Sequence, residues 1–182
     1  MDALQVLPPA LRAEWFTFAG LGFLSTDALE VGRAWRRLEA LADAREDAQA
    51  LASLETEELE KEHVRLFLAP QGAPLPPWQS AQGPGARLMG ESHHSALGWF
   101  RRYGIEPARP NEPADHVGLL LSFYGHLLTI QAEDAEEFRA QHLSWVPAFC
   151  QELKRHTSLP FYRWLAGLTI SLLQGGDAAG GV

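Results

Sequence analysis

Two short proline-bearing runs hold the residue types best suited to contacting a ligand. Residues 76–80 read Pro-Pro-Trp-Gln-Ser, and residues 111–116 read Asn-Glu-Pro-Ala-Asp-His. Consecutive prolines stiffen the first run, so Trp78 loses little conformational entropy on contacting a ligand. Pro113 suits the first turn of a helix, and Asp115 follows in that turn, where the helix dipole keeps a carboxylate ionised. From the residues alone the favoured interpretation is structural: Asp115 caps the helix and Trp78 fills the core.

The residues that could hold a metal or act as nucleophiles lack the spacing that such sites need. His93 and His94 are adjacent, so on a helix they point about 100° apart, and His116 and His126 stand about 15 Å apart along one helix. Cys150 lies between apolar neighbours, which favours an inert thiol. The chain has neither a Gly-x-Ser-x-Gly elbow nor a phosphate-binding Gly-Lys-Ser/Thr loop. We therefore expect no catalytic residue, no metal, no cofactor and no enzymatic activity.

Length and composition indicate one globular domain that works inside the cytoplasm. The chain has 182 residues, of which 46% are hydrophobic, and its formal net charge is −8. An acidic balance argues against nucleic acid as a partner. A single cysteine is compatible with a reducing compartment. The first residues lack the cationic start of an export signal, and no apolar run reaches the ~20 residues of a membrane span, so no stable membrane insertion is expected.

Helical periodicity dominates, and it predicts an all-α fold of about eight to ten helices in one domain over residues 1–174, with a disordered tail over 175–182. The first expected helices start at Pro8-Pro9 and near Asp27, the latter with Glu30 as capping partner, and further helices are expected within 46–53, over 55–68 and over 91–103 with Gly104 as cap. The next has Pro113 and Asp115 in its first turn and Val117 on its apolar face, and the last three start near Glu133, at Ser144 with Pro147 in the first turn, and at Ser158-Pro160. The helix near Val117 is apolar on more than one face, so it should be the most buried.

Residues 69–90 interrupt this pattern with a long segment rich in proline and glycine. An irregular segment of this length inside a compact domain usually serves a function or links domains. A plain linker would not carry Leu75, Trp78, Leu88 and Met89, which require burial or a ligand. The segment is therefore a candidate binding loop, with simple packing as the alternative.

An ordered set of motifs resembles the TorD/DmsD family of redox-enzyme maturation chaperones. The set comprises Arg65-Leu66-Phe67 with Pro70, the Pro-Pro-Trp-x-Ser run, Gly104-Ile105 and the Glu-Pro-x-Asp-His run. The order and spacing are similar throughout residues 63–128, with a weaker likeness to the last helix. The chain departs from the family in Ala81-Gln82, where an aromatic residue is common, and in His63.

The resemblance implies a chaperone that binds the twin-arginine signal peptide of the catalytic subunit of a molybdopterin oxidoreductase before export. On this hypothesis Asp115, together with Glu112, receives the guanidinium groups, and Pro113 shapes the same segment. Apolar residues of the signal would contact Leu75, Pro77 and Trp78, with hydrogen bonds from Ser80 and His116. The alternative is a helical protein-interaction adaptor that does not recognise signal peptides. Both a monomer and a domain-swapped dimer are compatible with the sequence.

Overall fold

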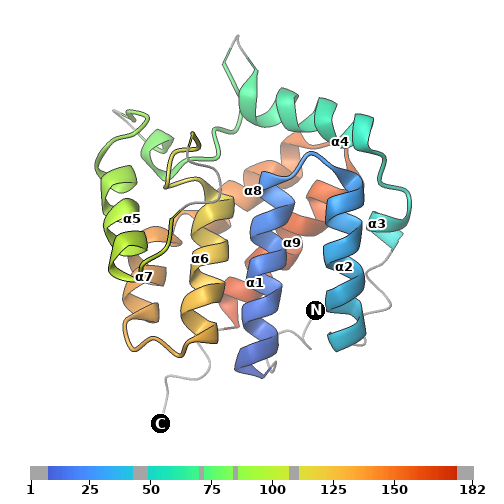
Figure 1. Ribbon diagram of the computed structural model, residues 1–182. Coiled ribbons are helices and arrows are strands. Elements are labelled where there is room, and N and C mark those ends of the chain that lie inside the picture. Colours follow the sequence, from blue (N-terminus) through green and yellow to red (C-terminus); the bar gives the residue numbers. More distant parts are fainter. Residues whose placement is uncertain (1–7, 43–48, 70–71, 84–85, 107–110, 176–182) are drawn as a thin grey trace.

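The computed structural model describes residues 8–42, 49–69, 72–83, 86–106 and 111–175, and these form an all-helical structure (Figure 1). Its helices are α1 (Pro9–Leu24), α2 (Ala28–Ala42), α3 (Gln49–Ala52), α4 (Thr56–His63), η3 (Val64–Leu68), η4 (Gln79–Ala81), α5 (Glu91–Arg102), α6 (Val117–Thr129), α7 (Ala135–His142), α8 (Val146–His156) and α9 (Pro160–Gln174). The predicted fold class is confirmed. The assignment of residues 1–174 to one domain stays a prediction, and residues 46–48 and 176–182 lie outside the described part.

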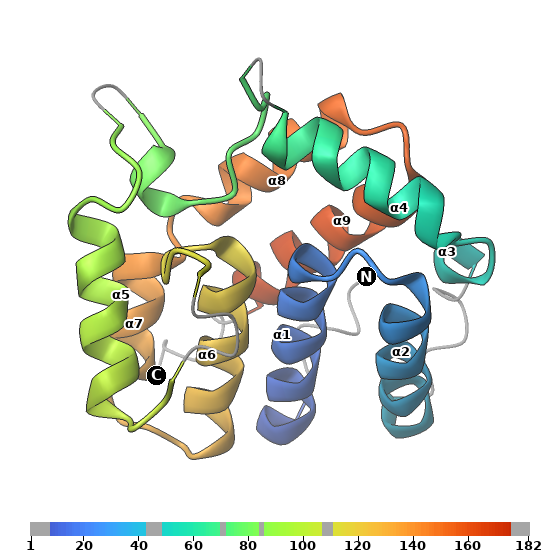
Figure 2. The ribbon, with the colours of Figure 1, turned by 45° about the horizontal axis from the view of Figure 1, so that its top comes forward.

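The centre of the fold is the close pairing of α1 with α6, which lie side by side in Figures 1 and 2. Glycines permit the approach: a Cβ added to Gly20 would lie 2.5 Å from the carbonyl oxygen of Gly118, and one added to Gly118 would lie 2.6 Å from that of Gly20. Helix α9 packs against α1, and α8 packs against α9. As predicted, α6 is the most deeply buried helix, with Leu120, Leu121 and Tyr124 fully enclosed.

An aromatic cluster fixes α2 to α1 and α9. The ring of Trp35 meets those of Trp15, Phe18 and Trp164 edge to face, with centroids 5.9, 5.8 and 5.5 Å away. Aromatic pairs in this geometry contribute about 0.5–1.5 kcal/mol beyond their buried area. Helix α2 is thus held rigidly, and its opposite face is exposed.

A buried carboxylate connects α4 to the turn between α8 and α9. Glu62 accepts two hydrogen bonds from Arg65, at 2.7 and 2.8 Å, and bonds from the Thr157 hydroxyl and the Ser158 amide, both at 2.9 Å. The hydrogen bonds from Arg65, followed by those from Ser158 and Thr157, lower the pKa of Glu62 to about 2 against the opposing effect of burial. Figure 2 shows α4 lying across the ends of its neighbours, where this contact forms.

Several helix ends differ from the sequence prediction. The helix expected over 55–68 is α4 followed by a π-helical turn, η3, a form that is often found at functional sites. Helix α8 begins after Trp145 rather than at a Ser144 cap, with Pro147 in its first turn as expected. Asp27 does accept from the Leu29 amide, but Glu30 bonds the Ser25 hydroxyl at 2.5 Å instead of completing a capping box. Gly104 has φ +66°, as its predicted capping position requires.

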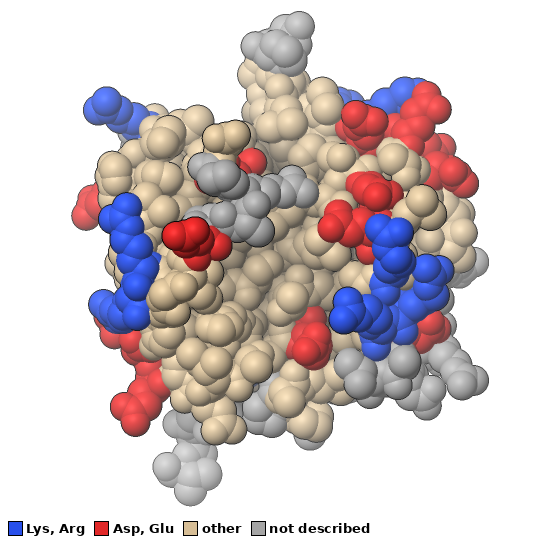
Figure 3. Space-filling model, viewed as in Figure 1, with Lys and Arg blue, Asp and Glu red and all other residues tan. Residues whose placement is uncertain are grey.

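Charge is distributed unevenly over the surface. Acidic side chains gather over α4, and a group of basic side chains lies over α2 (Figure 3).

Within the described residues no helix combines the length and the apolar character that a membrane crossing requires.

Candidate functional site

The two proline-bearing runs lie against each other, as a shared site requires. The Val117 amide donates to the Pro77 carbonyl at 2.8 Å, and the Gln79 amide donates to the Asp115 carbonyl at 3.0 Å. Trp78 and His116 form an isolated antiparallel bridge between these bonds. The binding loop, defined as residues 75–82, is therefore joined through its backbone to the segment that enters α6.

Asp115 lies behind the binding loop rather than on the surface. Its exposure is 0%, and its Oδ2 accepts a 2.6 Å hydrogen bond from the Ser80 amide. Its Oδ1 has no partner among the described residues, nor has the Ser80 hydroxyl. In this conformation Asp115 is closed off from solvent and its carboxylate holds the loop through the Ser80 amide. The expectation that Asp115 receives a guanidinium directly stays a prediction.

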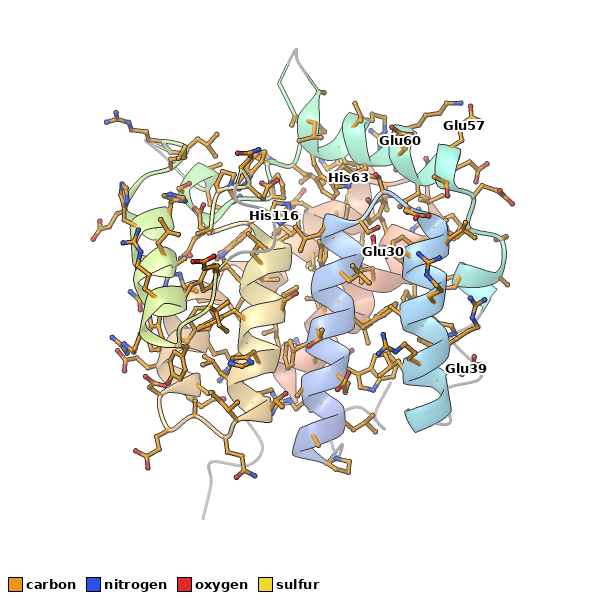
Figure 4. All side chains as sticks on the ribbon, viewed as in Figure 1. Glu30, Glu39, Glu57, Glu60, His63 and His116 are labelled. Atoms are coloured by element: carbon orange, nitrogen blue, oxygen red, sulfur yellow. The ribbon has the colours of Figure 1, made fainter. Side chains whose placement is uncertain are left out.

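Asp115 does not cap helix α6. The helix begins at Val117, and the Nδ1 atom of His116 accepts from the Gly118 amide at 3.0 Å, so His116 is the cap. Figure 4 shows His116 at this end of α6. Pro113 therefore precedes the helix, and the prediction that Pro113 and Asp115 lie in its first turn is wrong. The reason is local: two turn residues follow Pro113 before helical hydrogen bonding starts.

Trp78 and Glu112 form the accessible part of the site. The indole Nε1–H of Trp78 donates to Oε1 of Glu112 at 2.6 Å, and its ring stands edge to face with His116, with centroids 6.0 Å apart. Both side chains are partly exposed, whereas His116 is buried. Oε2 of Glu112 makes no hydrogen bond to another described residue. A partly exposed indole ring thus lies edge-on beside a carboxylate that can still accept hydrogen bonds.

The other predicted site residues support the loop or lie at its edge. Leu75 is 6% exposed and its amide donates to the Leu66 carbonyl at 3.1 Å, and Pro77 is also buried. Neither presents much of its side chain to solvent in this conformation, and the expectation that they contact apolar residues of a ligand stays a prediction. Pro113 and Ser80 are partly exposed.

A hydrogen-bonded chain behind the loop was not foreseen. The Gln79 side chain donates to the Gln141 carbonyl at 2.9 Å and accepts from Nδ1 of His142 at 2.8 Å. The other ring nitrogen of His142 meets the Ser95 hydroxyl at 3.1 Å, and Ser95 accepts from the Gln141 side chain. Burial lowers the pKa of His142 to about 4, although nearby Asp115 opposes the shift, so this imidazole is neutral at pH 7. The chain fixes the loop to α5 and α7.

The histidines and the cysteine hold structural positions. Nδ1 of His93 accepts from the Ala114 amide at 2.9 Å and thereby orders the segment before Asp115. His63 is buried and meets the Tyr162 hydroxyl at 3.0 Å. Burial raises the pKa of the Cys150 thiol, which suits an unreactive side chain. Among the described residues no three metal-ligating side chains come together.

Comparison with known proteins identifies the family. The sequence model of the nitrate reductase delta subunit family matches residues 26–156. The chain therefore belongs to that family.

The names of similar proteins indicate which class of protein within this family the chain resembles. The chain is 34% identical to the Tat proofreading chaperone DmsD of Salmonella typhi, over 67% of this chain and 65% of that protein. It is 28% identical to the chaperone protein TorD of Photobacterium profundum, over 88% of this chain and 78% of that one. A crystal structure of a candidate redox enzyme maturation protein from Archaeoglobus fulgidus superposes with a TM-score of 0.71 at 25% identity, covering 89% and 93% of the two chains. The resemblance to the TorD/DmsD group is confirmed, and the match spans just under two thirds of the Salmonella relative.

Proposed function

We propose that this protein is a cytoplasmic chaperone that binds the twin-arginine signal peptide of a molybdopterin oxidoreductase subunit and supports its maturation before export. One observation supports this most strongly. In a chain whose relatives are named Tat proofreading chaperones, partly exposed Trp78 of the binding loop donates a hydrogen bond to partly exposed Glu112 of the segment that enters α6, and the loop is fixed from behind. The relatives are named as chaperones, and we assign no catalytic role to this chain.

Glu112 is the carboxylate that we assign to the arginines of the signal. Its Oε1 accepts the indole N–H of Trp78 and its Oε2 makes no hydrogen bond to another described residue, so both oxygens retain lone pairs for a guanidinium. A planar guanidinium fork matches a carboxylate with two parallel hydrogen bonds, which an ammonium group cannot form. Such charge-assisted bonds contribute about 1.5–3 kcal/mol each before desolvation is subtracted. The Trp78 ring is partly exposed and meets Glu112 with its N–H edge, so it can contact the same guanidinium or an apolar side chain.

The remaining site residues act by holding these two in place. Asp115 fixes the Ser80 amide, His116 caps α6 and packs against the Trp78 ring, and Leu75, Pro77 and Pro113 shape the backbone around them. A preorganised loop lowers the entropy cost of binding. The unpartnered Ser80 hydroxyl can donate to a peptide carbonyl once a ligand displaces the groups that cover it.

The proposal is tested by isothermal calorimetry with a twin-arginine signal peptide and a matched peptide in which both arginines are lysines. The two peptides carry the same charge, so they differ only in whether the cationic group is a planar guanidinium or an ammonium. We expect the arginine peptide to bind at least about tenfold more tightly. Equal binding of the two peptides, or no binding of either, would reject signal recognition and favour a helical adaptor of another kind.

A further inference from the structure

A second surface, separate from the Trp78–Glu112 site, has the character of a binding groove. It lies between α1 and α2, has a volume of about 690 Å³, and is lined by Leu21, Glu30, Arg33, Ala34, Arg36 and Arg37. Figure 4 shows Glu30 in the space between these helices and His116 on the far side of α1, at the end of α6. The groove and the candidate site are therefore on different parts of the molecule.

The arginines of the groove have no charge partner among the residues that the structure describes. Arg33, Arg36 and Arg37 are exposed, and in the described part of the chain none of the three forms an ion pair or a side-chain hydrogen bond. Their spacing of three and four residues places them on adjacent turns of one helix. The opposite face of α2 is fixed by Trp35 in the aromatic cluster, so the three guanidinium groups project from a rigid support. The chain as a whole carries a net charge of −8, which makes this concentration of positive charge distinctive.

We infer that this groove, the α2 arginine groove, binds an acidic segment of a protein partner. Arginine is enriched in protein interfaces, where its aliphatic stem packs and its guanidinium pairs with carboxylates. Apolar side chains accompany the charges: Leu21 and Ala34 line the groove, and Leu29, 69% exposed, stands one turn before Arg33. The mixture suits a segment that carries glutamate or aspartate together with an apolar residue.

The surroundings are less suited to a phosphate group. Phosphate sites usually use free backbone amides at a helix start. Here the first amides of α2 are occupied: that of Ala28 donates to the Thr56 hydroxyl and that of Leu29 donates to Asp27. The carboxylate of Glu30 at the groove would also repel a compact dianion. An extended acidic segment can avoid Glu30 while its carboxylates reach the arginines.

The charges next to the groove would orient a bound acidic segment relative to α2 and α4. The glutamates of α4, Glu57, Glu58 and Glu60, are exposed, and Figure 3 shows acidic side chains over α4 beside the basic group over α2. Complementary and repulsive patches placed side by side steer association and fix the register of a complex. An acidic segment would be attracted to α2 and repelled by α4.

The test is fluorescence anisotropy with the full chain and a labelled amphipathic peptide that carries glutamate on one face and leucine on the other. A second peptide has glutamine in place of every glutamate. The variant R33A/R36A/R37A removes the arginines, and R101A/K154A/R155A removes the same charge from the C-terminal ends of α5 and α8, where Arg101 and Arg155 are exposed, Lys154 is half-buried and Arg155 pairs with Glu152. Calorimetry with the twin-arginine peptide reports whether the first site survives in each variant.

We expect the glutamate peptide to bind at least about tenfold more weakly to R33A/R36A/R37A than to the wild type, and within about twofold of wild type to the control variant. Binding should weaken between about 50 and 300 mM salt, and the glutamine peptide should bind at least about tenfold more weakly. Three outcomes would overturn the inference: equal binding by wild type and R33A/R36A/R37A, equal binding of both peptides, or saturable binding of sodium tripolyphosphate that depends on the arginines when peptide binding does not. If R33A/R36A/R37A no longer bound the twin-arginine peptide, the inference that the groove is separate from the Trp78–Glu112 site would be contradicted.

Discussion

Replacing Asp115 by alanine tests whether this residue positions the loop or contacts the ligand. The substitution removes a fully buried carboxylate and leaves the Ser80 amide, 2.6 Å from Oδ2 in the wild type, without its acceptor. A hydrogen bond to a charged group contributes about 1.5–3 kcal/mol, and relief of the buried, half-partnered carboxylate offsets part of the loss. We therefore expect the free energy of unfolding to fall by about 1–2 kcal/mol. For a chain of this length, that lowers Tm by roughly 2–8 °C.

Hydrogen exchange measured by mass spectrometry locates the effect. In D115A the amides of residues 78–82 should exchange faster, while those of α1 and α6 keep their protection. The variant D115N retains an acceptor oxygen for Ser80, so its loss of Tm should be about half that of D115A.

Peptide binding separates the two roles of Asp115. If the residue only positions the loop, D115A binds the twin-arginine peptide more weakly but still prefers it to the lysine peptide, because Glu112 is unchanged. The reasoning is refuted if Tm and loop exchange match the wild type while the preference for arginine disappears. That result would mean that Asp115 itself reads the guanidinium.

Three further predictions follow from the contacts described above. Trp78→Ala should weaken binding of the twin-arginine peptide by about tenfold or more, whereas Trp78→Phe should lose less, because only the N–H bond to Glu112 is removed; equal effects in calorimetry would contradict a role for the ring. Glu62, with its pKa lowered to about 2, stabilises the fold above pH ~4.5 and loses this contribution as pH falls towards 2, so thermal melts from pH 5 to 3 should show a steeper fall for wild type than for E62Q; parallel curves would count against the Arg65 contact. Gly20→Ala should destabilise the α1–α6 pairing by about 2–4 kcal/mol, whereas Gly98→Ala, which meets no atom within 4 Å, should stabilise α5 by about 0.5–1 kcal/mol in denaturant unfolding; similar shifts for both would refute the close approach.

The helices were predictable from sequence because each buries a periodic apolar face. The helix α6 was foreseen as the most buried one because its apolar residues cover more than one stripe, and Leu120 and Leu121 are fully enclosed. The cap at Gly104 was equally clear, since its positive φ favours glycine. Periodicity could not reveal that η3 widens into a π-helix, because the side-chain pattern of 64–68 is the same for both helix types.

The site was only partly predictable. The resemblance to a known family predicted that the Trp78 run and the Asp115 run belong to one site. In the structure the two runs are in contact. The sequence could not show that Asp115 is covered, because residues 111–116 follow no regular period from which burial can be deduced. The His142 support was missed for another reason: its partners Gln79 and Ser95 come from segments far away in the chain.

A double-mutant cycle on Glu112 tests the central claim most directly. Calorimetry would measure wild type and E112Q against the arginine peptide and the lysine peptide, giving four affinities and one coupling energy. If Glu112 forms the two parallel bonds proposed, E112Q weakens the arginine peptide far more than the lysine peptide, with a coupling energy of about 1 kcal/mol or more. A coupling energy near zero, with both peptides weakened equally, would contradict recognition of the arginine pair at the Trp78–Glu112 site.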